Sequence, residues 1–408
     1  MIIPSAVNLP LKVLAPPSKS HTVRALILSA FATGTSRLKN LLISQDAKKL
    51  MAALEKLGAK MRWENREGCK ELVVVGNGGI VTGFFAEPLD LGNSGIALRF
   101  LSALTCLASK PVTFTGDASL RARPMGDLLR GLEQLKSCIN RDLPLLVELE
   151  GQDSQPVSAL IFLGMLLDRP LEICVKNPGE KPWVALSLGW LDDLGVRYKN
   201  EDFKKITIFG SGSYRGFSHQ VSGDFSSISY PLAAAILTRS HLVIEGIDFS
   251  DRQGDKALIS VLKEMGADIR SSKNALEVFP TEFLEGRAID VNPLIDALPL
   301  LAVIGCYAKG KTKLFNGAIA RAKECDRIEV ITQELNKMNA HIEVEKEGLV
   351  VYEKGLKGAF VDSHNDHRIA LALAIAALRA EGKTEIANTA CIEKTYPDFF
   401  KTVFFSCP

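Results

Sequence analysis

The sequence has no excess of charge of either sign, no cysteine pair at metal-ligand spacing and no long apolar run. Its 49 Lys and Arg against 47 Asp and Glu give a formal charge of +2, which argues against a dedicated nucleic-acid-binding protein. The apolar stretch from Ala297 to Ala308 is interrupted by Pro299 and Gly305 and falls short of the ~20 residues that span a bilayer. The opening MIIPSAVNLPLKV lacks the pattern of a cleavable signal. We therefore expect a cytoplasmic protein without a membrane segment.

The eight cysteines are scattered along the chain, without a CxxC pair and without histidines at ligand spacing. This distribution predicts neither a disulfide framework nor a metal site. We expect most of these cysteines to be buried thiols that pack as small hydrophobic side chains.

A pattern of about 70 residues recurs six times along the chain, and internal repetition of this kind fixes the architecture. The apolar helices of the six copies are expected at KSHTVRALILSAF, GNSGIALRFLSAL, DSQPVSALIFLGMLL, DFSSISYPLAAAIL, NPLIDALPLLAVIG and HNDHRIALALAIAAL. Strands are expected to follow them near Ser36, Val112, Leu171, Leu242, Thr312 and Thr384. A helix start carries free N–H groups and about half a positive charge. Six polar helix starts that converge would therefore form an anion site.

Six β-α-β-α-β-β repeats of this length cannot share one core, because single cores stop growing near about 250–300 residues. Two groups of three repeats are the economical division. The segment SHQVSGDFSS predicts a boundary at Ser222 and Gly223. The opening strand is expected to pair with the second half, which places a second crossing near Pro17. We predict domains of 18–223 and of 1–17 plus 224–408, and we interpret the short interval at QLKSCINRDLP as the loss of a loop.

Cations recur at the starts of the repeats. They are Lys19, Arg24, Arg99, Arg123, Arg327, Arg368 and Lys394. A single exposed cation is usually a solvated surface charge, but recurrence at one structural place in several repeats favours binding. Because the guanidinium fork matches phosphate and carboxylate, these residues predict small, multiply charged substrates.

Two carboxylates stand among these cations. Asp296 enters the apolar helix NPLIDALPLL, and Glu324 lies beside Lys323 in AKECDR. They are candidates for general base and general acid, although a helix-start carboxylate and a surface ion pair remain alternatives. A histidine at a helix start, such as His367, is more often a hydrogen-bonded cap than a catalyst.

Several motifs together resemble one family, in the family's order and over nearly the whole chain. They are PPSKSHTVRAL, LGNSGIALRFL, TGDASLRARPMGDLL, SGDFSSISY, QGDKALISVLKEMGA, AKECDRI, NDHRIAL and EKTYPDFF. The family is 5-enolpyruvylshikimate-3-phosphate synthase (3-phosphoshikimate 1-carboxyvinyltransferase). The resemblance implies an α/β enolpyruvyl transferase fold: a two-domain inside-out α/β barrel with three β-α-β-α-β-β repeats per domain and the active site in the interdomain cleft.

The resemblance also implies a reaction. The enolpyruvyl group of phosphoenolpyruvate would be transferred to the 5-hydroxyl of shikimate 3-phosphate by addition and elimination of phosphate, in the shikimate pathway to chorismate and the aromatic amino acids. A cytoplasmic monomer would do this without a metal or other cofactor, since the cations already neutralise the developing charge.

The same resemblance assigns residues to both substrates. For shikimate 3-phosphate it implies Lys19, Ser20, Arg24, Ser154, Gln155, Asp296 and Lys323. For phosphoenolpyruvate it implies Lys19, Gly95, Arg123, Gln155, Arg327, Arg368 and Lys394. Asp296 would take the proton from the 5-hydroxyl, and either Glu324 or Lys19 would move the proton at C3.

The chain departs from the family pattern in three motifs. Asp153 and Glu180 replace two serines near the substrate phosphate, where a like charge is repulsive, so their side chains must turn away or be compensated. Asp153 could instead cap the following helix. Ile96 and Phe100 replace the usual Thr and Pro. These changes predict reduced sensitivity to glyphosate, the family's inhibitor.

We considered two alternative functions. The sister enzyme that acts on UDP-N-acetylglucosamine carries a reactive cysteine on the loop before its Arg-Pro, and the equivalent TGDASLRARP has none. A non-catalytic, anion-binding relative is favoured only by the carboxylates Asp153 and Glu180.

Overall fold

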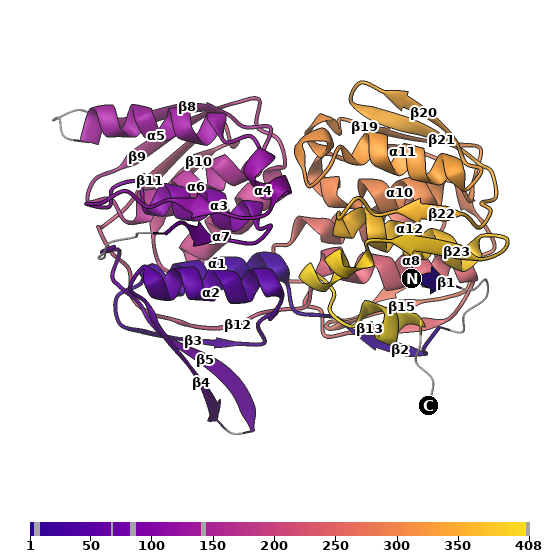
Figure 1. Ribbon diagram of the computed structural model, residues 1–408, viewed down its shortest axis with the longest axis horizontal. Helices are drawn as coiled ribbons and strands as arrows, with labels where there is room; N and C mark the ends of the chain where they lie inside the picture. Colours follow the sequence, from indigo (N-terminus) through magenta and orange to yellow (C-terminus); the bar gives the residue numbers. More distant parts are fainter. Residues whose placement is uncertain (4–8, 67, 82–86, 140–143, 405–408) are drawn as a thin grey trace. The chain divides into compact units, whose positions relative to one another are not determined.

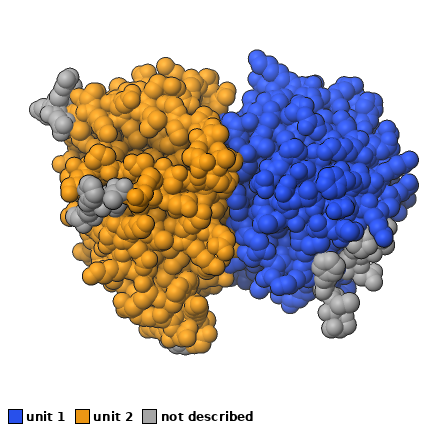
Figure 2. Space-filling view, viewed as in Figure 1, with its two compact units in different colours: residues 1–18, 222–408 blue, residues 19–221 orange. Residues whose placement is uncertain are grey.

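The computed structural model describes residues 1–3, 9–66, 68–81, 87–139 and 144–404. The chain forms two compact units: residues 1–18 and 222–408 make unit 1, and residues 19–221 make unit 2 (Figure 2). The assignment of 18–223 and of 1–17 plus 224–408 to separate domains stays a prediction. Across the described ranges, no helix is long and apolar enough to cross a membrane.

The helices of unit 2, labelled in Figure 1, differ in how much of their surface is buried. Those that are apolar all round are buried on nearly every side, as expected for helices inside a core, and they are α1 (Lys19–Phe31), α3 (Gly95–Leu104) and α6 (Ser154–Met165). Amphipathic helices bury one face only, and they are α2 (Gln45–Lys56) and α5 (Gly126–Ile139). The remaining helices are α4 (Ala118–Ala122) and α7 (Lys181–Asp193).

The sheets of unit 2 have the strand orders β12-β3-β5-β4, β10-β11-β9-β8 and β6-β7. The strands of the first are β12 (Ser218–Gln220), β3 (Thr35–Lys39), β5 (Cys69–Val75) and β4 (Lys60–Arg66). Those of the second are β10 (Arg197–Glu201), β11 (Lys205–Phe209), β9 (Leu171–Lys176) and β8 (Leu145–Glu150), and the pair is β6 (Leu89–Asp90) and β7 (Phe114–Thr115). Strands β8 and β9, which flank α6, pair in parallel with Val147 opposite Ile173. A helix between two parallel neighbours is the expected crossover.

Unit 1 repeats this arrangement. Its buried helices are α8 (Phe225–Thr238), α10 (Leu298–Gly305) and α12 (His367–Arg379). Its outer helices are α9 (Ala257–Glu264) and α11 (Arg327–Lys337). Short helical segments connect them: η1 (Gly254–Lys256), η2 (Asn292–Ala297), η3 (Ala318–Ala322), η4 (Thr389–Lys394) and η5 (Phe400–Phe404).

The sheets of unit 1 have the orders β14-β15-β13-β2, β17-β19-β21-β20, β1-β23-β22 and β16-β18. The first contains β14 (Ile269–Ser271), β15 (Ala275–Val278), β13 (Leu242–Glu245) and β2 (Lys12–Leu14). The second contains β17 (Ala288–Asp290), β19 (Lys311–Phe315), β21 (Gly348–Tyr352) and β20 (His341–Glu345). The others contain β1 (Ile2–Ile3), β23 (Thr384–Ala387), β22 (Phe360–Asp362), β16 (Leu284–Glu285) and β18 (Ala308–Lys309).

Two strands lie in the unit opposite to the helix that follows them. β2 precedes α1 of unit 2 but pairs in parallel with β13 of unit 1, and β12 precedes α8 of unit 1 but pairs in parallel with β3 of unit 2. The segments that carry these crossings are joined by a bridge between Pro17 and Gly223 and by a hydrogen bond from Ser18 N to Ser222 O (2.9 Å). A Cβ at Gly223 would collide with the carbonyl oxygen of Gly246, so this close approach requires glycine.

The expected strands are present in all six repeats, as β3, β7, β9, β13, β19 and β23. The interpretation of QLKSCINRDLP as the loss of a loop is wrong. Within the described residues, α5 is followed by β8, which belongs to the next sheet, so β6 and β7 lack the antiparallel partners that β3 and β9 have. The described part of the second repeat therefore lacks the two strands that follow the second helix in the first and third repeats, β4 and β5 or β10 and β11.

The burial of α1 makes a stability prediction. Leu26 is fully buried, whereas Leu129 on α5 is 49% exposed. We expect Leu26→Ala to destabilise unit 2 by about 2–5 kcal/mol, because the change removes buried methyl groups and leaves a cavity. Leu129→Ala, the same substitution at the surface, should change stability by about 0.5 kcal/mol or less. Urea unfolding of both variants measures the difference, and equal losses would contradict a buried α1.

Candidate functional site

A buried guanidinium joins four segments of unit 1. Arg327, the first residue of α11, donates from Nη1 to Asp296 Oδ1 (2.7 Å) and from Nη2 to Glu324 Oε2 (2.8 Å). Its Nε donates to Asp366 Oδ2 (2.7 Å). Burial alone would lower the pKa of Arg327, but the three carboxylates outweigh it and hold the pKa well above its usual value. The cation is therefore permanent, and it fixes all three acids.

Asp296 lies in η2, not in the apolar helix where the sequence placed it. η2 ends just before α10, and Leu294 within it has non-helical backbone angles (φ −135°, ψ 44°). This kink turns Asp296 toward two cations, because its Oδ2 also accepts a hydrogen bond from Arg368 Nη2 (3.0 Å). The side chain of Asp296 is 23% exposed, so part of the carboxylate stays open to a ligand.

The start of α12 is capped by Asp366 and not by the neighbouring histidine. Asp366 Oδ1 accepts the backbone N–H of Arg368 (2.7 Å). His367 is the first helical residue, so its interpretation as a cap is wrong. Its buried ring places Nδ1 4.0 Å from Glu324 Oε1. The acid from the AKECDR segment and the histidine of α12 thus face each other.

A further acid, Asp255, lies close enough to Asp296 and Arg368 to interact with their charges. Asp255 in η1 is buried, and burial raises its pKa to about 7, with the charge of Asp296 adding to the rise and that of Arg368 opposing it. The sequence analysis quoted the motif QGDK but gave Asp255 no role. The signal that could have found it is an acid at a helix start just after a glycine.

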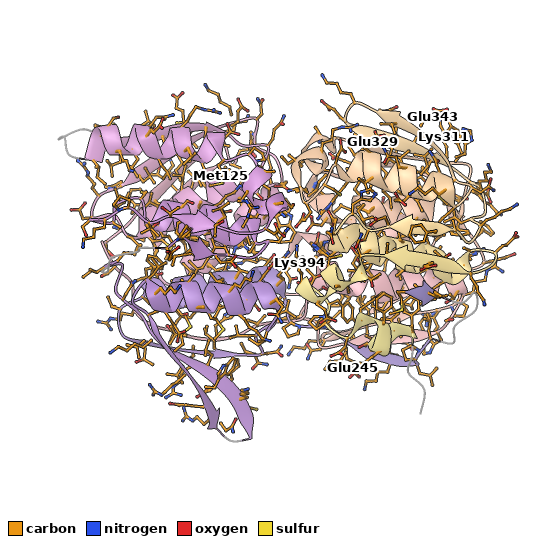
Figure 3. All side chains as sticks on the ribbon, viewed as in Figure 1. Met125, Glu245, Lys311, Glu329, Glu343 and Lys394 are labelled. Carbon is orange, nitrogen blue, oxygen red and sulfur yellow. The ribbon has the colours of Figure 1, made fainter. Side chains whose placement is uncertain are left out.

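Two lysines that the resemblance singles out also lie in unit 1. Lys323 follows η3 directly, precedes Glu324 and is half-buried. Lys394 ends η4 and is half-buried as well (Figure 3). Because η4 packs against α12, Lys394 belongs to the part of unit 1 that carries Arg368.

In unit 2, Arg99 connects the starts of α3 and α6. This buried side chain donates from Nη1 to Gln155 Oε1 (3.0 Å) and from Nη2 to Pro124 O (3.0 Å). Its Nη2 also lies 3.4 Å from Asp153 Oδ2. Arg99 was noted as a repeat-start cation but was not among the residues assigned to a substrate. The structure shows that Arg99 positions Gln155, a residue that the resemblance did assign to both substrates.

Gly95 makes room for guanidinium groups at the start of α3. A Cβ at this position would collide with Arg123 Nη1 and come within 3.0 Å of Arg99 Nη1. Arg123 Nη2 in turn donates to Asn93 Oδ1 (2.6 Å). Gly95, Arg123 and the GNSG turn therefore come together, as the sequence motifs suggested for an anion site.

Arg24 is a buried cation with neutral partners. Its Nε and Nη2 donate to Ser187 Oγ (3.3 and 3.0 Å), and its Nη1 donates to Ser20 O (3.2 Å). The guanidinium lies 5.3 Å from the ring centre of Phe100. Burial lowers the pKa of Arg24 to about 9, which still leaves it charged at neutral pH. Within the described part of the chain, Arg24 has no carboxylate partner, so its charge is available to an anionic ligand.

The other residues that the sequence analysis singled out on α1 and α3 differ in how deeply they are buried. Lys19 and Ser20 are the first residues of α1 and are half-buried. Ile96 is half-buried against the core of unit 2. Phe100 is fully buried and packs edge-on against Phe162, with ring centres 5.0 Å apart. Phe100 is thus a core residue, and α3 continues through it without a kink.

The two unexpected carboxylates are both accommodated at the start of α6. Asp153 caps this helix by accepting the N–H of Gln155 (3.0 Å), so the predicted capping role is confirmed. Glu180, at the N-cap position of α7, accepts hydrogen bonds from Ser154 N and Ser154 Oγ, both 2.9 Å long. Its carboxylate therefore points toward the expected phosphate-binding serine instead of turning away.

The cysteines differ from the expectation that most are buried. Among the described residues only Cys306 is buried, Cys69 is exposed and the others are intermediate, while Cys407 lies outside them. Burial raises the pKa of Cys106 to about 11, so this thiol is unreactive at neutral pH. In the described ranges, no group of three or more His, Cys, Asp or Glu side chains could hold a metal ion.

Comparisons with known proteins identify the family of this chain. Residues 5–403 match the family model of EPSP synthase (3-phosphoshikimate 1-carboxyvinyltransferase). A 3-phosphoshikimate 1-carboxyvinyltransferase of Chlamydia muridarum is 40% identical over 400 residues, which cover 94% of this chain and 89% of that protein. One of Chlamydia pneumoniae is 40% identical over 404 residues, covering 95% and 89%. The chain belongs to the EPSP synthase family.

Solved structures of similar fold support this family assignment. The EPSP synthase of Acinetobacter baumannii is similar with a TM-score of 0.77 at 25% identity, over 98% of this chain and 96% of that one. The enolpyruvyl transferase NikO of Streptomyces tendae shares the fold with a TM-score of 0.77 at 18% identity, over 98% and 96%. The expected two-domain α/β enolpyruvyl transferase fold is confirmed.

The buried acid of unit 1 predicts a pH dependence of stability. The pKa of Asp255 rises from 3.8 to about 7 on folding, so the folded protein binds a proton more tightly than the unfolded chain. The stability that this proton contributes is present below pH 3.8 and is lost as the pH rises to about 7. We expect Asp255→Asn to remove this loss, so that the variant gains stability over the wild type between those values.

Chemical unfolding at several pH values measures the effect. Asp193→Asn, at the exposed end of α7, is the matched control and should follow the wild type at every pH. A parallel decline of stability in Asp255→Asn and wild type would contradict the raised pKa of Asp255.

Proposed function

We propose that this protein transfers the enolpyruvyl group of phosphoenolpyruvate to the 5-hydroxyl of shikimate 3-phosphate and releases phosphate. The observation that carries the proposal is the Asp296 carboxylate, which is partly open and is held between Arg327 and Arg368. A base next to cations that can bind an anionic cosubstrate is the arrangement that the reaction needs.

The acceptor is assigned to residues of unit 2 together with Asp296 and Lys323. Arg24 is a buried cation whose partners are neutral, and Ser154 and Gln155 begin α6 with N–H groups and a positive helix end. Lys19 and Ser20 begin α1 in the same unit. These donors fit an acid that carries both a phosphate and a carboxylate.

Phosphoenolpyruvate is assigned to Lys19, Gly95, Arg123, Gln155, Arg327, Arg368 and Lys394. When its negative groups bind Arg327 and Arg368, they compete with Asp296 for the same N–H donors. Loss of these donors raises the proton affinity of the Asp296 carboxylate. The base is therefore strengthened only when the cosubstrate is present, and it can then take the proton of the 5-hydroxyl as that oxygen attacks C2.

A second group must move the proton at C3, and two residues remain candidates. Glu324 is fixed by Arg327 and faces His367, through which a proton could be exchanged. Lys19 is the alternative, as the first residue of α1. The tetrahedral adduct then loses phosphate, and the surrounding guanidinium groups stabilise the charge that develops on the leaving group.

A non-catalytic, anion-binding protein is the second candidate function. The hydrogen bonds from Ser154 to Glu180 favour it, because they occupy donors assigned to the acceptor phosphate. Release of inorganic phosphate from phosphoenolpyruvate in the presence of shikimate 3-phosphate distinguishes the two functions. Binding of either substrate without phosphate release would support the non-catalytic function.

We further propose that the protein acts in the cytoplasm as a monomer. The near-neutral charge of +2 supports a partner set of small molecules without nucleic acid. Sedimentation of the purified protein with and without substrates tests the oligomeric state, and a stable dimer would contradict this part of the proposal.

Replacement of the proposed base gives the first functional test. Asp296→Asn should lower kcat by about 10²–10⁴-fold, the usual effect of losing a general base. Binding of both substrates should persist, because Arg327 keeps Glu324 and Asp366 as partners while Arg368 gains freedom to bind an anion. Steady-state kinetics and equilibrium binding measure the two effects. A loss of binding with unchanged kcat would make Asp296 a positioning residue.

Lys19→Met is a contrasting variant. A cation that contacts both substrates contributes to binding as well as turnover, so this change should raise both KM values and lower kcat. An effect on kcat alone would assign Lys19 to the proton transfer at C3 only.

Glyphosate inhibition tests the phosphoenolpyruvate pocket. Ile96 is a stiff, β-branched residue next to Gly95, and we expect it to crowd the longer inhibitor more than phosphoenolpyruvate. Ile96→Thr should therefore increase sensitivity to glyphosate with little change in the KM for phosphoenolpyruvate. Phe100 is left unchanged, since proline at this buried helix position would cost about 3 kcal/mol. Equal inhibition of the variant and the wild type would contradict the role of Ile96.

A further inference from the structure

The start of α6 holds a carboxylate that comes from the start of α7. Glu180 Oε2 accepts hydrogen bonds from the backbone N–H and the hydroxyl of Ser154, each 2.9 Å long. Glu180 is 1% exposed and Ser154 is 4% exposed. A buried carboxylate thus makes the two contacts that a ligand anion would make at this helix start.

This arrangement is unfavourable for Glu180 in two respects. Its backbone is left-handed (φ 43°, ψ 36°), a conformation that residues with a long side chain rarely adopt. Its carboxylate has also lost nearly all contact with water, which is costly for a charge. Two donors and the positive end of α6 offset these costs. The start of α6 therefore attracts an anion strongly enough to hold this one.

Neighbouring groups on α6 and α7 also favour an anion near the start of α6. Gln155, the next residue of α6, is oriented by Arg99 (3.0 Å). Ser187, on the helix that Glu180 begins, links the buried Arg24 cation to Ser158 of α6 through hydrogen bonds of 3.0 and 2.9 Å. A buried cation thus lies next to the second turns of α6 and α7, and an oriented amide lies at the start of α6.

We propose that Glu180 determines the affinity for the acceptor: its carboxylate occupies the anion position on Ser154 and must leave before the phosphate of the acceptor binds there. This inference rests on the proposed function, in which Ser154 binds that phosphate. A site that is free for only a fraction of the time has its apparent affinity reduced by that fraction. The hydrogen bonds to this charged group correspond to a reduction of about ten- to hundredfold.

The test compares Glu180→Ser and Glu180→Gln with the wild type by titration calorimetry. The probes are shikimate 3-phosphate, unphosphorylated shikimate and inorganic phosphate. We expect Glu180→Ser to bind shikimate 3-phosphate about ten- to hundredfold more tightly, to bind inorganic phosphate more tightly as well, and to bind shikimate as the wild type does. Glu180→Gln removes the charge but keeps an acceptor on Ser154, so its gain should be smaller. Glu133→Ser, at an exposed position on α5, is the control for net charge and should change none of the three affinities.

Each other result would overturn the proposal. Unchanged or weaker binding of shikimate 3-phosphate by Glu180→Ser would mean that Glu180 does not compete with it. An equal gain for shikimate would mean that the pocket has loosened in general. If Glu180→Ser fails to fold, as judged by thermal unfolding, Glu180→Gln must still show the gain for the phosphorylated probes alone.

The failure of this inference is distinguishable from that of the proposed function. Absence of phosphate release from phosphoenolpyruvate and shikimate 3-phosphate in every variant would refute the enzyme activity. The affinity of Glu180→Ser for inorganic phosphate does not depend on turnover, so it reports on the anion position in either case.

Discussion

The arrangement of unit 1 depends on one buried cation. Arg327 binds Asp296, Glu324 and Asp366, and these residues come from η2, the segment after η3 and the cap of α12. Taking a guanidinium out of water is strongly unfavourable unless carboxylates surround it. Without the cation, the three acids would each lose a charged partner, and Asp366 would remain buried. Segments that are 70 residues apart in the sequence, from position 296 to position 366, are therefore held in one geometry by a single side chain.

The two units solve the problem of buried charge differently. In unit 1 the arginines are neutralised by acids of the chain itself. Burial would lower the pKa of Arg368, but the charge of Asp296 together with those of Tyr230, Asp255 and Asp224 raises it above its usual value. In unit 2 Arg24 has neutral partners, and burial lowers its pKa to about 9. An anionic ligand would relieve the unpaired charge of Arg24, whereas in unit 1 it must compete with Asp296. This difference supports our proposal that unit 1 supplies the proton acceptor and that Arg24 of unit 2 binds a phosphorylated acid.

Glu180 shows how one side chain of the protein can occupy the start of a helix. The helices α6 and α7 both form with Glu180 at this place, and its carboxylate accepts a hydrogen bond from Ser154. A serine at this place would add donors for a ligand, while a glutamate supplies the anion itself. Glu180 therefore satisfies donors at the start of α6 within the protein itself, and in our proposal the energy of that contact is subtracted from the binding of the acceptor.

Much of the fold was determined by the sequence alone. The apolar helices that begin at Lys19, Ser154 and His367 were predicted because each one is hydrophobic all round, and the strands of the six repeats follow them. The cations at the repeat starts were also predicted, since recurrence at equivalent places is visible in one chain. The position of Asp296 was not, because the kink at Leu294 depends on how η2 packs and not on local propensity.

Only the tertiary structure decided which charged groups meet. The sequence places Asp366 next to His367 but cannot tell which of them caps α12, because this depends on the backbone direction at the helix start. It gives no sign that Asp255 is buried near Asp296. The resemblance placed Glu180 near the substrate phosphate, but it did not show that this carboxylate accepts hydrogen bonds from Ser154. Helix and strand patterns arise from neighbours along the chain, and a single sequence records them. Ion pairs, burial and pKa shifts arise from residues that are distant along the chain, so they exist only after the fold has brought those residues together.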